Sequence, residues 1–127
     1  MPVSGTGTPW GQRVLVAGAG IAGASAVRFL LGQGTSVTVC DNNSKATRPL
    51  VELGAAASTV DEILARDAWV DDFDLVVTSP GFRPDNPMLV AAADAGLPVW
   101  GEVELAWQVD RSGITGPPRQ WLVVTGT

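Results

Sequence analysis

Short apolar segments alternate with segments of helical spacing along most of the chain. The apolar runs, several of them rich in β-branched residues, predict strands at 13–17, 36–40, 55–58, 75–78 and 98–100. Apolar residues three or four positions apart predict helices over 21–33 and 102–109. Thr47-Arg48-Pro49 predicts the start of a short helix that Gly54 ends, because proline is tolerated in a first turn. Further helices are predicted from 59 to about 67 and from 86 to about 96. Two starts carry capping signals: Thr59 with Glu62 as a capping box, and Asn86 followed by Pro87.

This alternation predicts an α/β fold of Rossmann-like type, with about five strands in a parallel sheet and helices on both faces. Ligands of such sheets bind beyond the carboxyl ends of the strands, near the point where the strand order reverses. Candidate functional residues are therefore sought directly after the strands.

Gly- and Pro-rich segments divide the chain. We expect a flexible leader over residues 1–12 and the folded domain over residues 13–110. Residues 111–119 contain two glycines and two prolines and predict a linker. The apolar residues that follow, within 120–127, predict the first strand of a truncated second domain.

Composition excludes several kinds of chemistry. The 127 residues include no His, no Tyr and one cysteine, Cys40, which excludes His-based catalysis, an internal disulfide and a multi-cysteine metal site. The net charge is −5 and Lys45 is the only lysine, so nucleic acid is a poor partner. No apolar stretch is long enough to span a membrane. We expect a soluble, cytoplasmic binding domain.

The glycine pattern Gly18–Gly23 follows a predicted strand and opens a predicted helix, as a G-x-G-x-x-G loop requires. Gly18 would permit the tight turn, Gly20 would let the backbone approach a phosphate, and Gly23 would let the helix pack on the strand. Free amides at the helix start would then bind a pyrophosphate. The alternative is a strand–helix turn whose glycines serve packing alone.

Three further segments follow strands. Asp41 stands where an acid holds ribose hydroxyls or faces a nucleobase N–H, although it could instead form an Asx turn with Asn42 and Asn43. The segment Ser79-Pro80-Gly81 would lie on the same sheet edge, unless it is a plain turn. The terminal Thr125-Gly126-Thr127 is typical of the start of a phosphate loop, or of a simple turn.

Acidic side chains also gather before the fourth strand. We interpret Asp71, Asp72 and Asp74 as a solvated loop rather than as an acid–base or metal site.

Taken in order, these motifs resemble the Mur ligase family over about residues 13–127. The resemblance rests on the segments 18–23, 39–41, 77–82, 91–96, 100–105 and 123–127. It implies a three-domain cytoplasmic enzyme of peptidoglycan synthesis that joins D-glutamate to UDP-MurNAc-L-alanine, using ATP and Mg²⁺. This chain would be its amino-terminal, UDP-binding domain, a monomer whose partners are the substrate and the remaining two domains. Gly126 and Thr127 would begin the ATP loop, and the chain alone would bind neither ATP nor Mg²⁺ and would be inactive.

The resemblance also assigns residues. The backbone of Ile21 and Ala22 would contact the diphosphate, and Asp41 and Asn42 would contact uracil or ribose. Ser79, Pro80 and Gly81 would wall the nucleotide pocket. An Arg that stacks on uracil in related proteins would fall at Asn43; either Lys45 or Arg48 substitutes for it, or the stacking is absent. Two other interpretations stay open: the NAD-binding domain of a dehydrogenase, and a regulatory nucleotide-sensing module.

Overall fold

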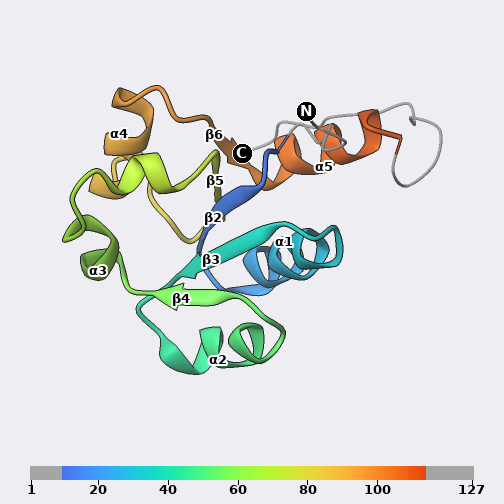
Figure 1. Cartoon of the computed structure of the whole chain (residues 1–127), viewed down its shortest axis with the longest axis horizontal. Coiled ribbons are helices and arrows are strands. Elements are labelled where there is room, and N and C mark those ends of the chain that lie inside the picture. Colours follow the sequence, from blue (N-terminus) through green and yellow to red (C-terminus); the bar gives the residue numbers. More distant parts are fainter. Residues whose placement is uncertain (1–9, 114–127) are drawn as a thin grey trace.

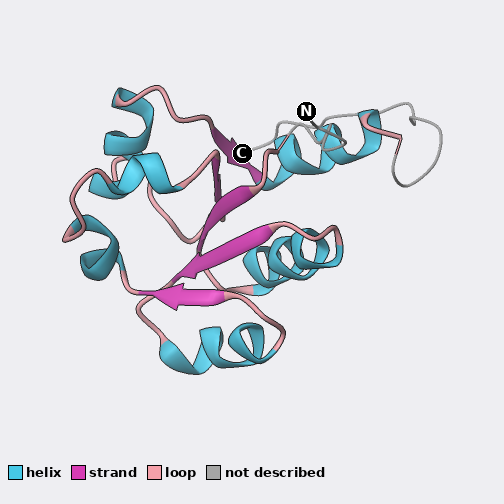
Figure 2. Ribbon diagram, viewed as in Figure 1, coloured by secondary structure: helices cyan, strands magenta, loops and turns pink. Residues whose placement is uncertain are grey.

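Five parallel strands form one sheet in residues 10–113, the part of the chain that the computed structural model describes (Figures 1 and 2). The strands are β2 (Arg13–Ala17), β3 (Ser36–Cys40), β4 (Ala56–Ser58), β5 (Leu75–Thr78) and β6 (Val99–Gly101). The helices are α1 (Ile21–Gly32), α2 (Ser44–Glu52), α3 (Val60–Leu64), the 3₁₀ turn η1 (Trp69–Asp72), α4 (Pro87–Asp94) and α5 (Glu102–Arg111).

Helices cover both faces of this sheet. Side chains of α1, α2 and α5 pack on one face, against residues such as Val14, Val16 and Val77. Side chains of α3, η1 and α4 pack on the other face, against Leu15 and Val76. Alternate residues of β2 thus enter opposite cores, which is why its sequence is apolar at every position after Arg13. The predicted Rossmann-like α/β fold is confirmed.

The strand order is β4-β3-β2-β5-β6. The chain runs outward from β2 through β3 to β4, then returns to the other side of β2 with β5 and β6. The order therefore reverses between β2 and β5. The crevice at the carboxyl ends of these two strands is the place where sheets of this kind bind ligands.

Several helix boundaries differ from prediction. Helix α2 begins at Ser44 because the Asn43 side chain accepts a hydrogen bond from Lys45 N–H, so Pro49 lies inside the helix and not in its first turn. Helix α3 is shorter than predicted and ends at Leu64, although its Thr59–Glu62 capping box is confirmed. Helix α5 extends to Arg111, into the predicted linker. The rest of that linker from residue 114, and the predicted strand with Gly126 and Thr127, lie outside the described residues.

Trp10 belongs to the core and not to a flexible leader, which corrects the prediction for residues 10–12. Its side chain is 1% exposed, and its indole Nε1 donates to Thr35 Oγ1 at 3.1 Å. Its ring meets Phe29 edge to face, with centroids 5.6 Å apart. The remaining residues of the predicted leader, 1–9, lie outside the described residues.

Asp74 is exposed, as predicted for this acidic loop, and it also anchors the start of β2. Its Oδ2 accepts from the backbone N–H groups of Gln12 and Arg13 at 3.0 and 2.9 Å, and its Oδ1 accepts from the Arg13 guanidinium at 3.2 Å. Burial raises the pKa of Asp74, but these hydrogen bonds outweigh it and hold the pKa below its usual range.

Candidate functional site

Three loops meet at the carboxyl edge of the sheet. Gly18, Asp41 and Ser79 each come directly after a strand, and the paired register of β2 with β3 and β5 brings the three strand ends level. Gly18 N–H donates to the Cys40 carbonyl at 2.8 Å, and Ser79 N–H donates to the Ala17 carbonyl at 3.0 Å. The first residues of all three predicted binding segments therefore lie side by side.

The glycine loop has the geometry of an anion-binding turn. Gly18 has φ +108°, which a residue with a side chain rarely adopts. Gly20 is the N-cap of α1 and supplies no side-chain cap. The first-turn N–H groups, from Ile21, Ala22 and Gly23, have no acceptor within an α-helix. Together with the helix dipole they form a site for negative charge.

The outer two glycines of the loop are needed for packing. A Cβ on Gly23 would lie 1.8 Å from the Gly18 carbonyl oxygen, so α1 can approach β2 only with glycine there. A Cβ on Gly18 would collide with Ser79 Oγ. Gly20 is different, because a Cβ there would meet nothing within 4 Å. Packing therefore explains Gly18 and Gly23 and leaves Gly20 for close approach by a ligand.

A hollow of about 500 Å³, which we call the loop hollow, lies between these segments. It is lined by eight of the ten predicted substrate-binding residues and by Phe82: Gly18, Gly20, Ile21, Ala22, Asp41, Ser79, Pro80, Gly81 and Phe82. The other two predicted residues are Gly23, buried in the helix–strand contact, and Asn42, which lies in an adjoining hollow. Sequence reasoning missed Phe82 as a site residue, although it directly follows Ser79-Pro80-Gly81.

Asp41 links the loops through both carboxylate oxygens. Its Oδ2 accepts from Ala19 N–H and its Oδ1 accepts from Asn43 N–H, each at 2.8 Å. The Asx-type bond to Asn43, left open by the sequence, is therefore present. The bond to Ala19 was not anticipated, and it ties the glycine loop to the end of β3. Each oxygen keeps a further lone pair for a ligand donor.

The two asparagines after Asp41 have separate tasks. Asn42 Oδ1 accepts from Val60 N–H at 3.2 Å, which leaves its Nδ2 as a donor at the sheet edge. The Asn43 side chain caps α2 through Lys45 N–H at 3.0 Å. Asn43 is thus occupied by local structure.

The site offers recognition rather than covalent chemistry. Burial raises the pKa of Cys40 to about 12, with smaller contributions from the negative charges of Asp41 and Glu62, so its thiol stays protonated and is a poor nucleophile. Within residues 10–113 no three His, Cys, Asp or Glu side chains are grouped to hold a metal ion. Around the loop hollow the edge presents backbone N–H groups, the Asp41 carboxylate and the Ser79 hydroxyl, with the Asn42 amide in the adjoining hollow.

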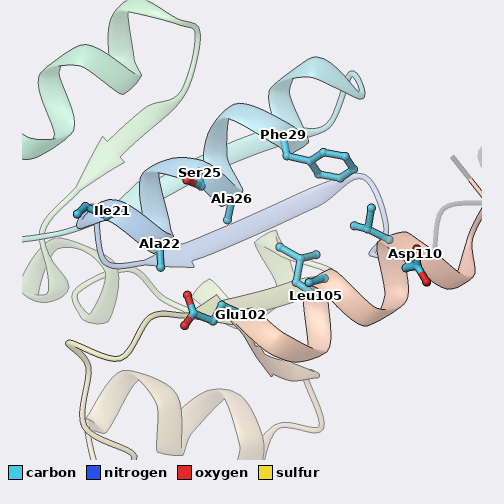
Figure 3. Close-up of a pocket in the computed structure, with 10 residues that line it drawn as sticks. Ile21, Ala22, Ser25, Ala26, Phe29, Glu102, Leu105 and Asp110 are labelled. Carbon is cyan, nitrogen blue, oxygen red and sulfur yellow. The ribbon is translucent and has the colours of Figure 1, made fainter. Parts of the chain in front are cut away.

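A further hollow, of about 650 Å³, lies between α1 and α5 (Figure 3). It shares Ile21 and Ala22 with the loop hollow, and Ala26 and Phe29 of α1 and Leu105 of α5 also line it. The rest of its lining is mostly apolar and comes from these two helices. The loop hollow instead gathers the loops after three strands at the strand-order reversal, so it is the better ligand site.

Comparison with known proteins agrees with this geometry. Residues 12–101 match the family model described as Mur ligase MurD-like, N-terminal domain. The chain belongs to this family. A UDP-N-acetylmuramoylalanine–D-glutamate ligase of Rhodococcus jostii is 52% identical over 123 residues, which cover 95% of this chain and 25% of that protein. The Mycobacterium tuberculosis ligase of the same name is 45% identical over 117 residues, covering 92% of this chain and 23% of that protein.

This MurD-like chain spans about a quarter of the length of the curated relatives it matches. Among solved structures, the UDP-N-acetylmuramate-alanine ligase MurC of Thermotoga maritima superposes with a TM-score of 0.65 at 23% identity, covering 81% of this chain and 23% of that one. A shikimate dehydrogenase of Aquifex aeolicus gives a TM-score of 0.50 at 18% identity over 76% of this chain and 45% of that one. At these identities both likenesses show the fold alone. The family match, rather than the fold, distinguishes the chain from a dehydrogenase domain.

Proposed function

We propose that this domain binds the UDP portion of UDP-MurNAc-L-alanine for an ATP-dependent ligase that adds D-glutamate in peptidoglycan synthesis. The observation that carries the proposal is the loop hollow at the strand-order reversal. There the uncapped first turn of α1 faces the Ser79–Gly81 turn and Asp41. The MurD-like family supports the choice of a uridine nucleotide over other diphosphates.

The diphosphate would bind to the backbone N–H groups of the first turn of α1. Gly20 leaves the space for phosphate oxygens to approach, and Ile21 and Ala22 supply donors. Ala22 has no hydroxyl, so all of its contribution comes from the backbone. Diphosphate binding does not require a Lys or Arg side chain at this site, because the aligned N–H groups and the helix dipole already favour negative charge.

The uracil would be recognised by the pair Asp41 and Asn42. Uracil presents an N–H flanked by two carbonyl oxygens. The free lone pairs of Asp41 accept from an N–H, and Asn42 Nδ2 donates to a carbonyl. A cytosine edge lacks that N–H, so this arrangement favours uridine over cytidine nucleotides.

Catalysis would require parts of the full-length enzyme outside residues 10–113. The described carboxyl edge has neither a lysine nor a group of metal ligands among its lining residues, so it does not fit ATP with Mg²⁺. We place both at residues beyond the described domain, with Gly126 and Thr127 as the start of the ATP loop. We expect the chain alone to have no ligase or ATPase activity.

The setting of the domain is likewise proposed from its family. We expect a cytoplasmic monomer that works with the other two domains of the ligase and contacts neither nucleic acid nor membrane. The net charge of −5 disfavours nucleic acid. No helix within residues 10–113 has the length and apolar character needed to cross a membrane.

Calorimetric titration of the chain with UDP, UDP-MurNAc-L-alanine and NAD tests this proposal. The uridine ligands should bind and NAD should bind more weakly or not at all. Gly20→Val should abolish uridine binding without a large loss of thermal stability, because its side chain would fill the phosphate position and a Cβ at Gly20 meets no protein atom within 4 Å. Tight NAD binding with no response to UDP would favour the dehydrogenase interpretation.

A further inference from the structure

A second hollow adjoins the loop hollow at the carboxyl edge. It has a volume of about 530 Å³, and we call it the outer hollow. Its lining includes Asp41, Asn42, Phe82 and Arg83. Asp41, Gly81 and Phe82 line both hollows, so the two spaces adjoin at these residues. A ligand held by the glycine loop can therefore extend past Asp41 into the outer hollow.

Phe82 is fixed in place before any ligand binds. Its N–H donates to the Ser79 carbonyl at 3.0 Å and closes the turn after β5. Its ring lies over the glycine loop, with Cδ1 3.5 Å from the position that a Cβ of Gly18 would take. Part of the ring packs on the core that α3 and α4 cover, which leaves the side chain half-buried. A ring held from these directions loses little freedom when a ligand arrives.

Of the described residues that line the two hollows, Phe82 alone carries an aromatic ring. The two residues named as substitutes for a stacking arginine, Lys45 and Arg48, line neither hollow. Asn43 takes that position and is occupied in capping α2. Lys45 lines a different hollow beside α1 and α2. Arg83 is paired with Asp85 at 3.1 Å, with both side chains largely exposed.

We infer that Phe82 supplies the face on which the nucleobase stacks, with the base in the outer hollow and the diphosphate in the loop hollow. This inference rests on the proposed function. Asp41 and Asn42 would read the edge of the base while Phe82 contacts its face. An aromatic face stabilises a stacked base by roughly 5- to 150-fold in affinity. Phe82 would thus determine affinity for the nucleoside and contribute nothing to recognition of the phosphates.

The test compares UDP with inorganic pyrophosphate for wild type, Phe82→Leu and Phe82→Trp. Phe82→Leu should weaken UDP binding by roughly 5- to 20-fold and leave pyrophosphate binding within twofold, because only the base loses a partner. Phe82→Trp keeps an aromatic face and should recover most of the UDP affinity. Phe29→Leu is the matched control: it makes the same change at another half-buried phenylalanine that lines neither hollow, and it should bind UDP like wild type.

Proton NMR of the nucleotide gives a readout that a merely structural role would not change. The uracil H5 and H6 signals should move upfield when UDP binds wild type, because they lie over a ring, and Phe82→Leu should remove that shift. Equal losses of UDP and pyrophosphate in a folded Phe82→Leu variant, or UDP affinity unchanged within twofold, would overturn the inference alone. Failure of wild type to bind UDP would overturn the proposed function and the inference with it.

Discussion

Gly20 and Gly23 lie three residues apart in the same loop, yet an added methyl group meets opposite surroundings at the two positions. In Gly23→Ala the new Cβ would lie 1.8 Å from the Gly18 oxygen and 2.7 Å from the Gly18 carbonyl carbon. Both are backbone atoms, and Gly18 is itself fixed by its N–H bond to the Cys40 carbonyl. Helix α1 and strand β2 must therefore separate by more than about 1 Å.

This separation should cost about 2 kcal/mol. Overpacking a core contact costs roughly 1–3 kcal/mol, and a backbone neighbour places this case at the upper end. The better helix propensity of alanine returns about 0.5–1 kcal/mol. For a domain of about 100 residues the net loss corresponds to a fall in Tm of roughly 8–16 °C.

Gly20→Ala is the control, because the same methyl group meets nothing within 4 Å and the backbone there has φ −68°. Replacing glycine by alanine at an N-cap should cost no more than about 1 kcal/mol. Its Tm should therefore fall by no more than about 4–8 °C. Thermal unfolding followed by circular dichroism measures both variants. A Gly23→Ala domain that melts within 3 °C of wild type would refute the packing argument for the loop, as would equal losses in the two variants.

Three further outcomes follow from other residues. Trp10→Ala should lower the free energy of unfolding by about 3–5 kcal/mol in a urea titration, whereas a dispensable leader would show no change. Cys40 should react with iodoacetamide at pH 8 only as the chain unfolds, because its pKa in the folded chain is raised to about 12. The stability that this raised pKa contributes is complete below about pH 8.5 and is lost as the pH rises above that value. Rapid labelling of the folded chain would contradict this. Asp41→Ala should weaken UDP binding by about 1–3 kcal/mol and reduce the selectivity for UDP over CDP. Asp41→Asn should have the smaller effect on UDP, because an amide oxygen can keep one of the bonds from Ala19 and Asn43. If Asp41→Ala leaves the affinities for both nucleotides unchanged, Asp41 is only a turn residue.

The sequence predicted where the site lies because that depends on local signals and one general rule. The carboxyl ends of parallel strands meet at one edge of the sheet, so the segments that follow three such strands must meet there too. These segments are Gly18–Gly23, Asp41 and Ser79. The structure confirms that all strands are parallel. No contact between distant side chains had to be known for this inference.

What the sequence did not predict depends on distant contacts. The sequence neighbours of Trp10 are mostly glycine, proline and threonine. Its place in the core depends on contacts with residues distant in sequence, such as Thr35 and Phe29. The bond from Ala19 to Asp41, and the place of Phe82 beside Asp41, follow from the register of neighbouring strands, which a sequence pattern does not specify.

Helix α2 shows a different kind of error. Proline is favoured in the first turn of a helix, so Thr47-Arg48-Pro49 predicts a helix start at these residues. The structure instead starts the helix with the Asn43 cap and tolerates Pro49 in its last turns, where one backbone hydrogen bond to the Lys45 carbonyl is absent. The cap residue Asn43 lies among other polar residues, so nothing in the sequence distinguishes it as the true start of the helix.

Residue-resolved NMR titration of the ¹⁵N-labelled chain with UDP tests the central claim most directly. The claim is that the glycine loop and the β3 and β5 loops together hold a uridine diphosphate. The amide signals of Gly20, Ile21 and Ala22 should shift most as the diphosphate binds, with further shifts at Asn42 and Phe82 beside the base. Shifts confined to residues of the α1–α5 groove that do not line the loop hollow, such as Phe29, Leu105 and Val109, or an unchanged spectrum at millimolar UDP, would contradict the account.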